Sequence, residues 1–291
     1  MEEYKLKVNN FRNPKRVALS KRYPSLKNII LFTRCSYNRC KLFMHSNYSF
    51  EQNEDFFPAV VARHQSPLFR TLGTSDVFLQ KNKVINIAQA LKKINGVIIY
   101  PGKTFSFWNV VGRPSYKNGY VDGMLLSDGK VVSGVGGGLC QLSNLLYWLF
   151  LHSELSVMKR MHHSRDVFPD NARTIPFGSG ATIMYNLIDL QIKNKTTYPV
   201  QIKIWLTEKQ LKVQLLAPQH VGKKFHVYEK NHIFIKDTEE YFRSNEIYRD
   251  TLAEGEVIKT EKITDTFAPV LYEVTDEYLQ RNKYASITIE H

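Results

Sequence analysis

The sequence is poor in cysteine, and it also has few glycines and prolines for its length. Three cysteines in 291 residues are too few, and odd in number, for a disulfide framework. Fifteen glycines and eleven prolines exclude a fibrous or linker-like protein. No apolar run approaches the roughly 20 residues of a membrane span. The first such run, Ile29 to Phe32, is too short and too late for a secretory signal. We therefore expect a cytoplasmic chain.

Aromatic and basic residues are plentiful by contrast. With 17 Phe, 16 Tyr and 3 Trp, the chain has enough apolar material for a core, which excludes wholesale disorder. The formal net charge is +13, and residues 1–50 alone hold 11 basic and 2 acidic residues. This segment could bind an anionic surface, although a solvated basic face is the simpler interpretation. No specific nucleic-acid partner is expected.

Hydrophobic periodicity divides the chain into three parts. Residues 1–60 show little periodicity and are interpreted as a basic N-terminal extension. Residues 61–218 combine helical and strand patterns, including a helix over Lys81–Ile94. Residues 219–291 contain short strand-like runs and are predicted to form a β-rich C-terminal region. These patterns predict an α+β fold with a mixed or antiparallel sheet.

The centre of this fold is predicted to be a buried helix. Leu139–Leu151 is apolar on almost every side, as is typical of a helix enclosed by a core, and a glycine-rich loop leads into it. Phe105–Trp108 predicts a short aromatic strand, and Asp128-Gly129 predicts a hairpin turn. Further strands are predicted at Tyr185–Lys193, Val200–Leu206 and Leu211–Leu216.

The most informative stretch is the glycine triplet that precedes the helix. Gly136, Gly137 and Gly138 are costly to order, so they mark a backbone that bends sharply or lies close to another group. Cys140 follows in the first helical turn, where the helix dipole is expected to lower the pKa of a thiol. Backbone N–H groups near Gly138 to Gln141 could hold an oxyanion during acyl transfer. A lone cysteine is also commonly inert core material, and this alternative stays open.

A thiol nucleophile needs a proton acceptor, and two histidines follow about twenty residues downstream. His162 and His163 are candidate bases, and Asp166 is a candidate for orienting one of them. A helix followed by a returning strand can bring such groups back to the start of the helix. Arg160 and Arg165 are candidates for binding a substrate carboxylate.

No cofactor or metal is expected from the remaining patterns. The glycine loop lacks the Lys-Ser/Thr of a P-loop and the spacing of a dinucleotide fingerprint. Cys35, Cys40 and His45 fall short of the four ligands of a structural zinc site. Asp189 stands in mostly apolar sequence and needs a partner if it is buried. Three histidines are interpreted as surface scatter: His220, His226 and His232.

A series of short motifs runs through the middle of the chain. They are Pro101–Phe107, Gly112, Gly119-Tyr120, Gly136–Ser143, Leu146-Tyr147, His163-Ser164, Gly178, Ala181-Thr182 and Asp189-Leu190. At these residues, over roughly 66–206, the chain resembles the VanW family in the order and approximate spacing of its motifs. The resemblance implies an accessory role in glycopeptide (vancomycin) resistance, close to peptidoglycan and the cell wall.

The resemblance also implies an activity. Cys140 would be the nucleophile of an L,D-transpeptidase-like acyl transferase, with His163 as its base, acting on peptidoglycan stem peptides or their precursors. The alternative is a non-catalytic accessory protein that binds such a precursor through the glycine loop. The chain departs from the family pattern at Asn144-Leu145, where a Ser/Thr pair is common, and at Gly180, where Asp is common. A wall enzyme would be envelope-associated, whereas no export signal is visible here.

Overall fold

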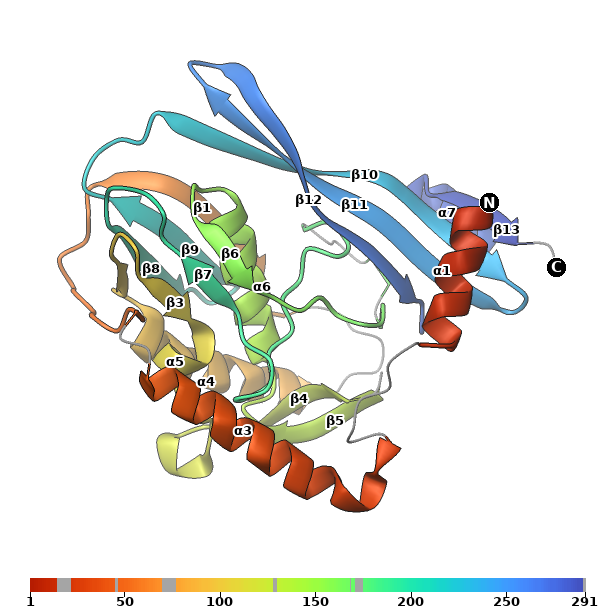
Figure 1. The fold of residues 1–291 in the computed structure, drawn as a ribbon, viewed down its shortest axis with the longest axis horizontal. Helices are drawn as coiled ribbons and strands as arrows, with labels where there is room; N and C mark the ends of the chain where they lie inside the picture. The colour runs from red at the N-terminus through yellow and green to blue at the C-terminus, as the bar shows by residue number, and fades with distance from the viewer. Residues whose placement is uncertain are drawn as a thin grey trace.

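Helices and short strands alternate through the first part of the chain, and long strands fill most of the rest (Figure 1). The computed structural model describes residues 1–14, 22–44, 47–69, 77–127, 130–167, 169–170 and 175–289. The helices are α1 (Glu2–Arg12), α3 (Lys27–Met44), α4 (Val77–Ile94), α5 (Phe107–Val111), α6 (Leu139–Leu151) and α7 (Asp276–Asn282), with short 3-10 turns η1 (Pro24–Leu26) and η2 (Tyr116–Asn118). The strands are β1 (Ala59–Pro67), β2 (Ile98–Ile99), β3 (Thr104–Ser106), β4 (Asp122–Ser127), β5 (Lys130–Val135), β6 (Ser156–Lys159), β7 (Gln191–Lys193), β8 (Val200–Leu206), β9 (Gln210–Ala217), β10 (Lys223–Asp237), β11 (Glu240–Ala253), β12 (Glu256–Pro269) and β13 (Ala285–Ile289).

Several sheets group these strands. One sheet has the order β1-β9-β8-β2 and is antiparallel throughout. A second, β3-β7-β6, is also antiparallel, and β4 pairs with β5 as a hairpin. The C-terminal sheet has the order β12-β11-β10-β13, in which β13 runs parallel to β10 and the other pairs are antiparallel. The predicted α+β class with mixed and antiparallel sheets is confirmed.

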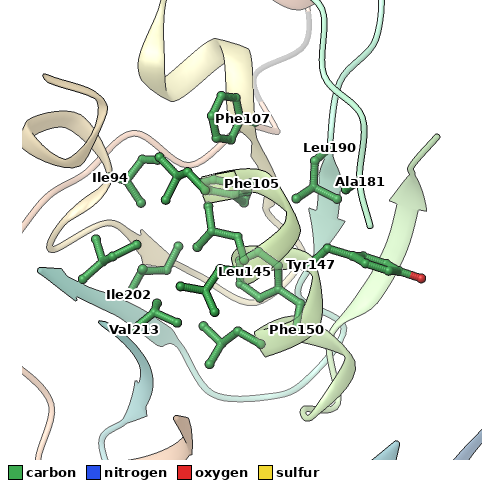
Figure 2. Close-up of a cluster of buried hydrophobic side chains, with 14 of the residues drawn as sticks. Ile94, Phe105, Phe107, Leu145, Tyr147, Phe150, Ala181, Leu190, Ile202 and Val213 are labelled. Carbon is green, nitrogen blue, oxygen red and sulfur yellow. The ribbon is translucent and has the colours of Figure 1, made fainter. Parts of the chain in front are cut away.

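Helix α6 is the centre of the core. It has the bounds that its apolar run predicts, and it contacts β1, β9 and α4. Figure 2 shows Leu145 and Phe150 in one cluster with Ile202 and Val213 of the adjacent sheet, while the hydroxyl of Tyr147 points out of the cluster. Because every face of α6 is apolar, its stability depends on these neighbours rather than on water.

The glycine triplet is explained by close packing at the entrance of α6. A Cβ atom on Gly137 would lie 2.1 Å from the carbonyl carbon of Gly123 in β4. Gly138 has a φ of +96°, and a Cβ there would lie 2.1 Å from the side chain of Lys83 in α4. Only glycine fits both positions, since one has no room for a side chain and the other is left-handed as well. The triplet therefore wedges α6 between the β4–β5 hairpin and α4.

Several other elements also match the sequence patterns. α4 begins at Val77, four residues before the predicted start at Lys81, and ends at the predicted Ile94. β8 has the predicted bounds, and β9 extends the predicted strand by one residue at each end. The hairpin is present as β4 and β5, whereas its predicted turn, Asp128-Gly129, lies outside the described residues.

Two predicted strands are wrong in part. Strand β3 ends at Ser106, where the predicted strand would continue to Trp108, because the Ser106 hydroxyl accepts the Asn109 N–H and caps α5. Asp189 fixes this corner: it accepts hydrogen bonds from the Ser106 hydroxyl at 2.6 Å and the Trp108 N–H at 3.1 Å. These are the partners that a buried carboxylate requires, and burial raises its pKa.

The second partly wrong strand is Tyr185–Lys193. A turn occupies residues 184–188, where the Ile188 N–H donates to Met184 O and Asn186 adopts a φ of +53°. Only β7, at the end of the predicted range, pairs in a sheet. The left-handed residue breaks the strand before its apolar alternation can be used.

The N-terminal part contains more regular structure than its weak periodicity predicts. α1 packs against the C-terminal sheet, where Val8 contacts Ile235, Phe242 and Ile289. Arg12 at the end of α1 pairs with Asp237 at 2.7 Å. α3 packs beside the 184–188 turn. None of the described helices is both long enough and apolar enough to cross a membrane.

A buried ion-pair network joins residues 166–170 to the C-terminal sheet. The Arg243 side chain of β11 is 2% exposed and donates to Asp166 at 2.9 Å and to Asp170. The Tyr272 hydroxyl donates to Asp166 at 2.9 Å, and the guanidinium lies 4.6 Å from the ring centre of Phe177. Removing one partner of such a network leaves the others buried with uncompensated charge.

Substitution of Gly137 by alanine tests the close packing. We expect Gly137→Ala to lower the free energy of unfolding by about 3 kcal/mol or more, because a methyl group would overlap the Gly123 backbone. Gly222→Ala is the matched control, since its Cβ has nothing within 4 Å and its change should stay within about 0.5 kcal/mol. Denaturant unfolding measures both. Equal effects would contradict the packing explanation.

Substitution of Arg243 by methionine tests the ion-pair network. We expect Arg243→Met to cost about 3–5 kcal/mol of unfolding free energy, because Asp166 and Asp170 remain buried without their partner. Arg281→Met, at an exposed position on α7, is the control. Adding Asp166→Asn and Asp170→Asn should restore part of the loss. A loss below about 1 kcal/mol in Arg243→Met would show that the network contributes little.

Candidate functional site

Cys140 lies half-buried in the first turn of α6 and packs against the main core. Burial raises the pKa of its thiol, and a hydrogen bond from the backbone of Ile183 offsets only part of this effect. This direction is opposite to the lowering expected for a cysteine at a helix N-terminus. At neutral pH the sulfur is therefore held as a thiol.

His163 lies close to the same turn of α6. Its Nδ1 is 2.9 Å from the Thr182 hydroxyl, and its Nε2 is 3.4 Å from the side-chain oxygen of Asn144. Asn144 follows Cys140 by four residues, so the two side chains are neighbours on one face of the helix. The structure thus brings His163 to within about one helical turn of Cys140. Within the described part of the chain, the Cys140 sulfur forms no hydrogen bond to this imidazole.

Four residues meet here, and we call them the Cys140 cluster: Cys140, Asn144, His163 and Thr182. All four are half-buried, so each retains some contact with solvent. The Asn144 oxygen also accepts the Ala181 N–H at 2.6 Å, which ties the 178–183 segment to α6. The cluster therefore contains a thiol, an amide, an imidazole and a hydroxyl at one partly accessible place.

The absence of a side chain at Gly180 makes room for the imidazole. A Cβ atom at this position would lie 2.7 Å from Cδ2 of His163 and 3.1 Å from the Asn144 oxygen. The imidazole thus takes the space next to a position where the VanW pattern commonly has Asp. This departure from the pattern is structurally tied to where His163 lies.

Arg160 supports the loop next to the cluster. Its Nε donates to the Gly180 carbonyl at 2.9 Å, and its Nη2 donates to the Gly178 carbonyl. The guanidinium also lies 4.8 Å from the ring centre of Tyr147. These contacts commit much of the side chain to the fold, so its predicted role in binding a substrate carboxylate gives way to holding the loop.

Three other predicted site residues point elsewhere. Asp166 is bound to Arg243 and Tyr272, whereas the His163 ring nitrogens face Thr182 and Asn144. Arg165 lines a pocket of about 590 Å³ beside α1 and the C-terminal sheet. Burial, together with the charge of Arg160, lowers the pKa of His162.

The residues predicted to bind substrate or an oxyanion mostly serve the fold. Gln141 donates from Nε2 to the Ser66 hydroxyl at 2.9 Å and to the Pro67 carbonyl at 2.6 Å, which joins α6 to β1. The Gly136 N–H donates to Val121 O, and the Gly137 N–H donates to Gly134 O. An oxyanion hole would have to use the amides from Gly138 to Cys140.

Two members of the cluster were not predicted as site residues. The spacing of Asn144, four residues after Cys140, places it on the same helix face and was a usable signal. Thr182 stands in one of the VanW motifs, yet only the fold shows that its hydroxyl meets His163. A partner that is distant in sequence cannot be identified from spacing alone.

Metal ligands do not gather in the described residues: no group of three or more potential ligands comes together there. Cys35 and Cys40 both lie on α3, where the Cys35 sulfur is 3.9 Å from the Tyr185 carbonyl and Cys40 is exposed. His45 lies outside the described residues. His226 stacks on Tyr228, His232 accepts a hydrogen bond from Arg243 and His220 is exposed.

Comparison with known proteins connects this geometry to a family. The sequence pattern of the family described as VanW like protein matches residues 82–216. The chain is 39% identical over 142 residues to the vancomycin B-type resistance protein VanW of Enterococcus faecalis (strain ATCC 700802 / V583), covering 49% of this chain and 52% of that protein. It is 31% identical over 123 residues to the uncharacterized protein YoaR of Bacillus subtilis (strain 168), covering 42% of this chain and 39% of that protein.

These alignments span about half the length, or less, of each relative. No solved structure matches the chain. The matched region nevertheless contains the glycine triplet, α6 and every member of the Cys140 cluster. Through residues 82–216, the chain belongs to the VanW family.

Proposed function

We propose that the protein is a VanW-like accessory protein of glycopeptide resistance that binds a peptidoglycan stem peptide or its precursor at the Cys140 cluster. The observation that carries this proposal is the convergence of His163 and Thr182 on the turn of α6 that begins at Cys140. The name of the Enterococcus relative supports the link to vancomycin resistance.

The chemistry of the cluster suits non-covalent recognition of a peptide. A stem peptide presents amide groups and a terminal carboxylate, which pair with hydroxyl, amide and imidazole groups. The first-turn N–H groups of α6 and the dipole of this helix favour a carboxylate close to Cys140. Partial burial strengthens such hydrogen bonds because it reduces competition from water.

Binding without chemistry fits the state of the thiol and the imidazole. A general base has to be within hydrogen-bonding reach of the proton that it removes. In this structure, Asn144 and Thr182 face the two ring nitrogens of His163, and the raised pKa of Cys140 disfavours the thiolate. These features support a peptide-binding site over a preformed nucleophile.

Acyl transfer is the second candidate function, and the closeness of His163 to the Cys140 turn favours it. In that reaction the thiol would attack a stem-peptide carbonyl and form a thioester. The departing amine would take up the thiol proton through His163. A second amine would then attack the thioester and regenerate the thiol. Substrate binding would have to turn the imidazole from Asn144 toward the sulfur.

The reactivity of Cys140 separates the two functions. Because burial raises its pKa, we expect iodoacetamide to label Cys140 more slowly at pH 7 than the exposed Cys40, with a midpoint above the usual value of about 8.5. Peptide mapping by mass spectrometry across a pH series measures both sites in one sample. Faster labelling of Cys140 at pH 7, with a midpoint below that value, would instead support acyl transfer.

Ligand binding by variants tests the site itself. For a synthetic stem peptide ending in D-Ala-D-Ala or D-Ala-D-Lac, we expect His163→Ala to weaken binding about fivefold or more, as the loss of one hydrogen bond predicts. Cys140→Ser should keep most of the affinity, and His220→Ala, at an exposed position, is the control. Calorimetric titration gives the constants, and thermal unfolding checks that each variant is folded.

Intact-protein mass spectrometry of the same mixtures provides the decisive contrast. Under the binding proposal, the mass of the wild-type protein stays unchanged after incubation with the peptide. An adduct that disappears in Cys140→Ser would contradict non-covalent binding and establish the thioester. If His163→Ala and His220→Ala bind equally well, the Cys140 cluster is not the binding site.

A further inference from the structure

Helix α3 lies at the edge of the fold and uses only one side to pack. Figure 1 shows it running along the lower edge of the molecule, with the rest of the fold on one side of it. From that side, Asn38 donates to the Asn186 carbonyl at 2.5 Å, and the Cys35 sulfur lies 3.9 Å from the Tyr185 carbonyl. The opposite side therefore faces outward.

Large apolar side chains occupy this outward side. Ile29 is 62% exposed, Phe32 is 72% exposed and Tyr37 is 67% exposed. Helical geometry places these positions on one broad face. Leu26, in the turn that precedes α3, is also exposed and extends the same apolar region. A contiguous exposed face of this kind marks a site of interaction, because isolated apolar side chains are the normal case for a surface.

The charge of this segment has one sign. Residues 22–44 contain five basic residues and no acidic residue. Among those whose side chains are described, Arg22 and Arg34 are both exposed. An apolar face flanked by basic residues is the pattern of helices that lie in the interface of an anionic bilayer, where aliphatic and aromatic groups enter the acyl boundary and cations meet the phosphates.

We propose that α3 is a membrane-surface helix that holds the protein on an anionic lipid bilayer. Ile29 and Phe32 enter the boundary between headgroups and acyl chains, and Arg22 and Arg34 contact the lipid phosphates. The helix lies in the plane of the interface, since no described helix is able to span the bilayer. The charge complementarity favours lipid over a second copy of the chain, because two α3 helices of the same sign would repel each other.

This inference is independent of the Cys140 cluster, which lies on α6. The two proposals can therefore fail separately: loss of lipid binding leaves peptide binding untouched, and the reverse also holds. Membrane attachment would keep the protein near any lipid-linked ligand by restricting its search to a surface.

Flotation with lipid vesicles tests the inference on the full chain. With vesicles of phosphatidylcholine and phosphatidylglycerol we expect binding that weakens at high salt, and much weaker binding to pure phosphatidylcholine. Ile29→Ser combined with Phe32→Ser should lower the vesicle partition coefficient by about tenfold or more, since two buried apolar side chains are lost. Arg34→Glu should weaken binding to the anionic vesicles specifically.

The matched control is a pair of exposed apolar residues on another surface. Val257 and Ile258 of β12 are 54% and 58% exposed, and Val257→Ser with Ile258→Ser should leave vesicle binding unchanged. Equal loss in both double variants, or no loss in the α3 variant, would overturn the inference. So would a dimer that the α3 variant converts to a monomer while the wild-type protein ignores vesicles. Circular dichroism and thermal unfolding confirm that each variant is folded.

Discussion

The need to enclose a helix that has no polar face determines much of this structure. Each face of α6 has to be covered by apolar neighbours, because an exposed apolar face would lose the free energy that burial provides. The β1-β9-β8-β2 sheet covers part of it, and α4 covers another part. The β4–β5 hairpin closes the entrance through backbone contact at Gly137. The position of Cys140 follows from this enclosure, since the first turn of α6 is fixed on several sides.

This enclosure changes the meaning of the glycine triplet. From sequence, three glycines before a cysteine are typical of an exposed nucleophile with an oxyanion hole. In the fold, Gly137 and Gly138 are needed because the backbone of β4 and the stem of Lys83 occupy the space of their side chains. Close packing alone therefore explains the triplet. The same packing half-buries Cys140 and raises its pKa, so a motif that resembles activation of a thiol has the opposite electrostatic result.

Periodicity predicted the elements whose partners are implied by their own pattern. The bounds of α6 and β8 agree with the predictions because an all-apolar helix and an alternating strand each carry a complete local signal. The turn at Asn186 was missed because its left-handed conformation has no apolar signature. The roles of Asp166 and Arg160 were also missed, since their partners, Arg243 and Gly180, are remote in sequence and only the fold brings them together.

The loop that carries His163 depends on contacts at both of its ends. On one side, Arg160 binds the carbonyls of Gly178 and Gly180. On the other side, Asp166 is clamped by Arg243 of the C-terminal sheet. Because buried ion pairs tolerate little displacement without a large cost in charge burial, the imidazole between them has a restricted position. The C-terminal sheet, which lies beyond the matched VanW region, thereby helps to position a residue of the Cys140 cluster, and the two parts of the chain form one structural unit around that site.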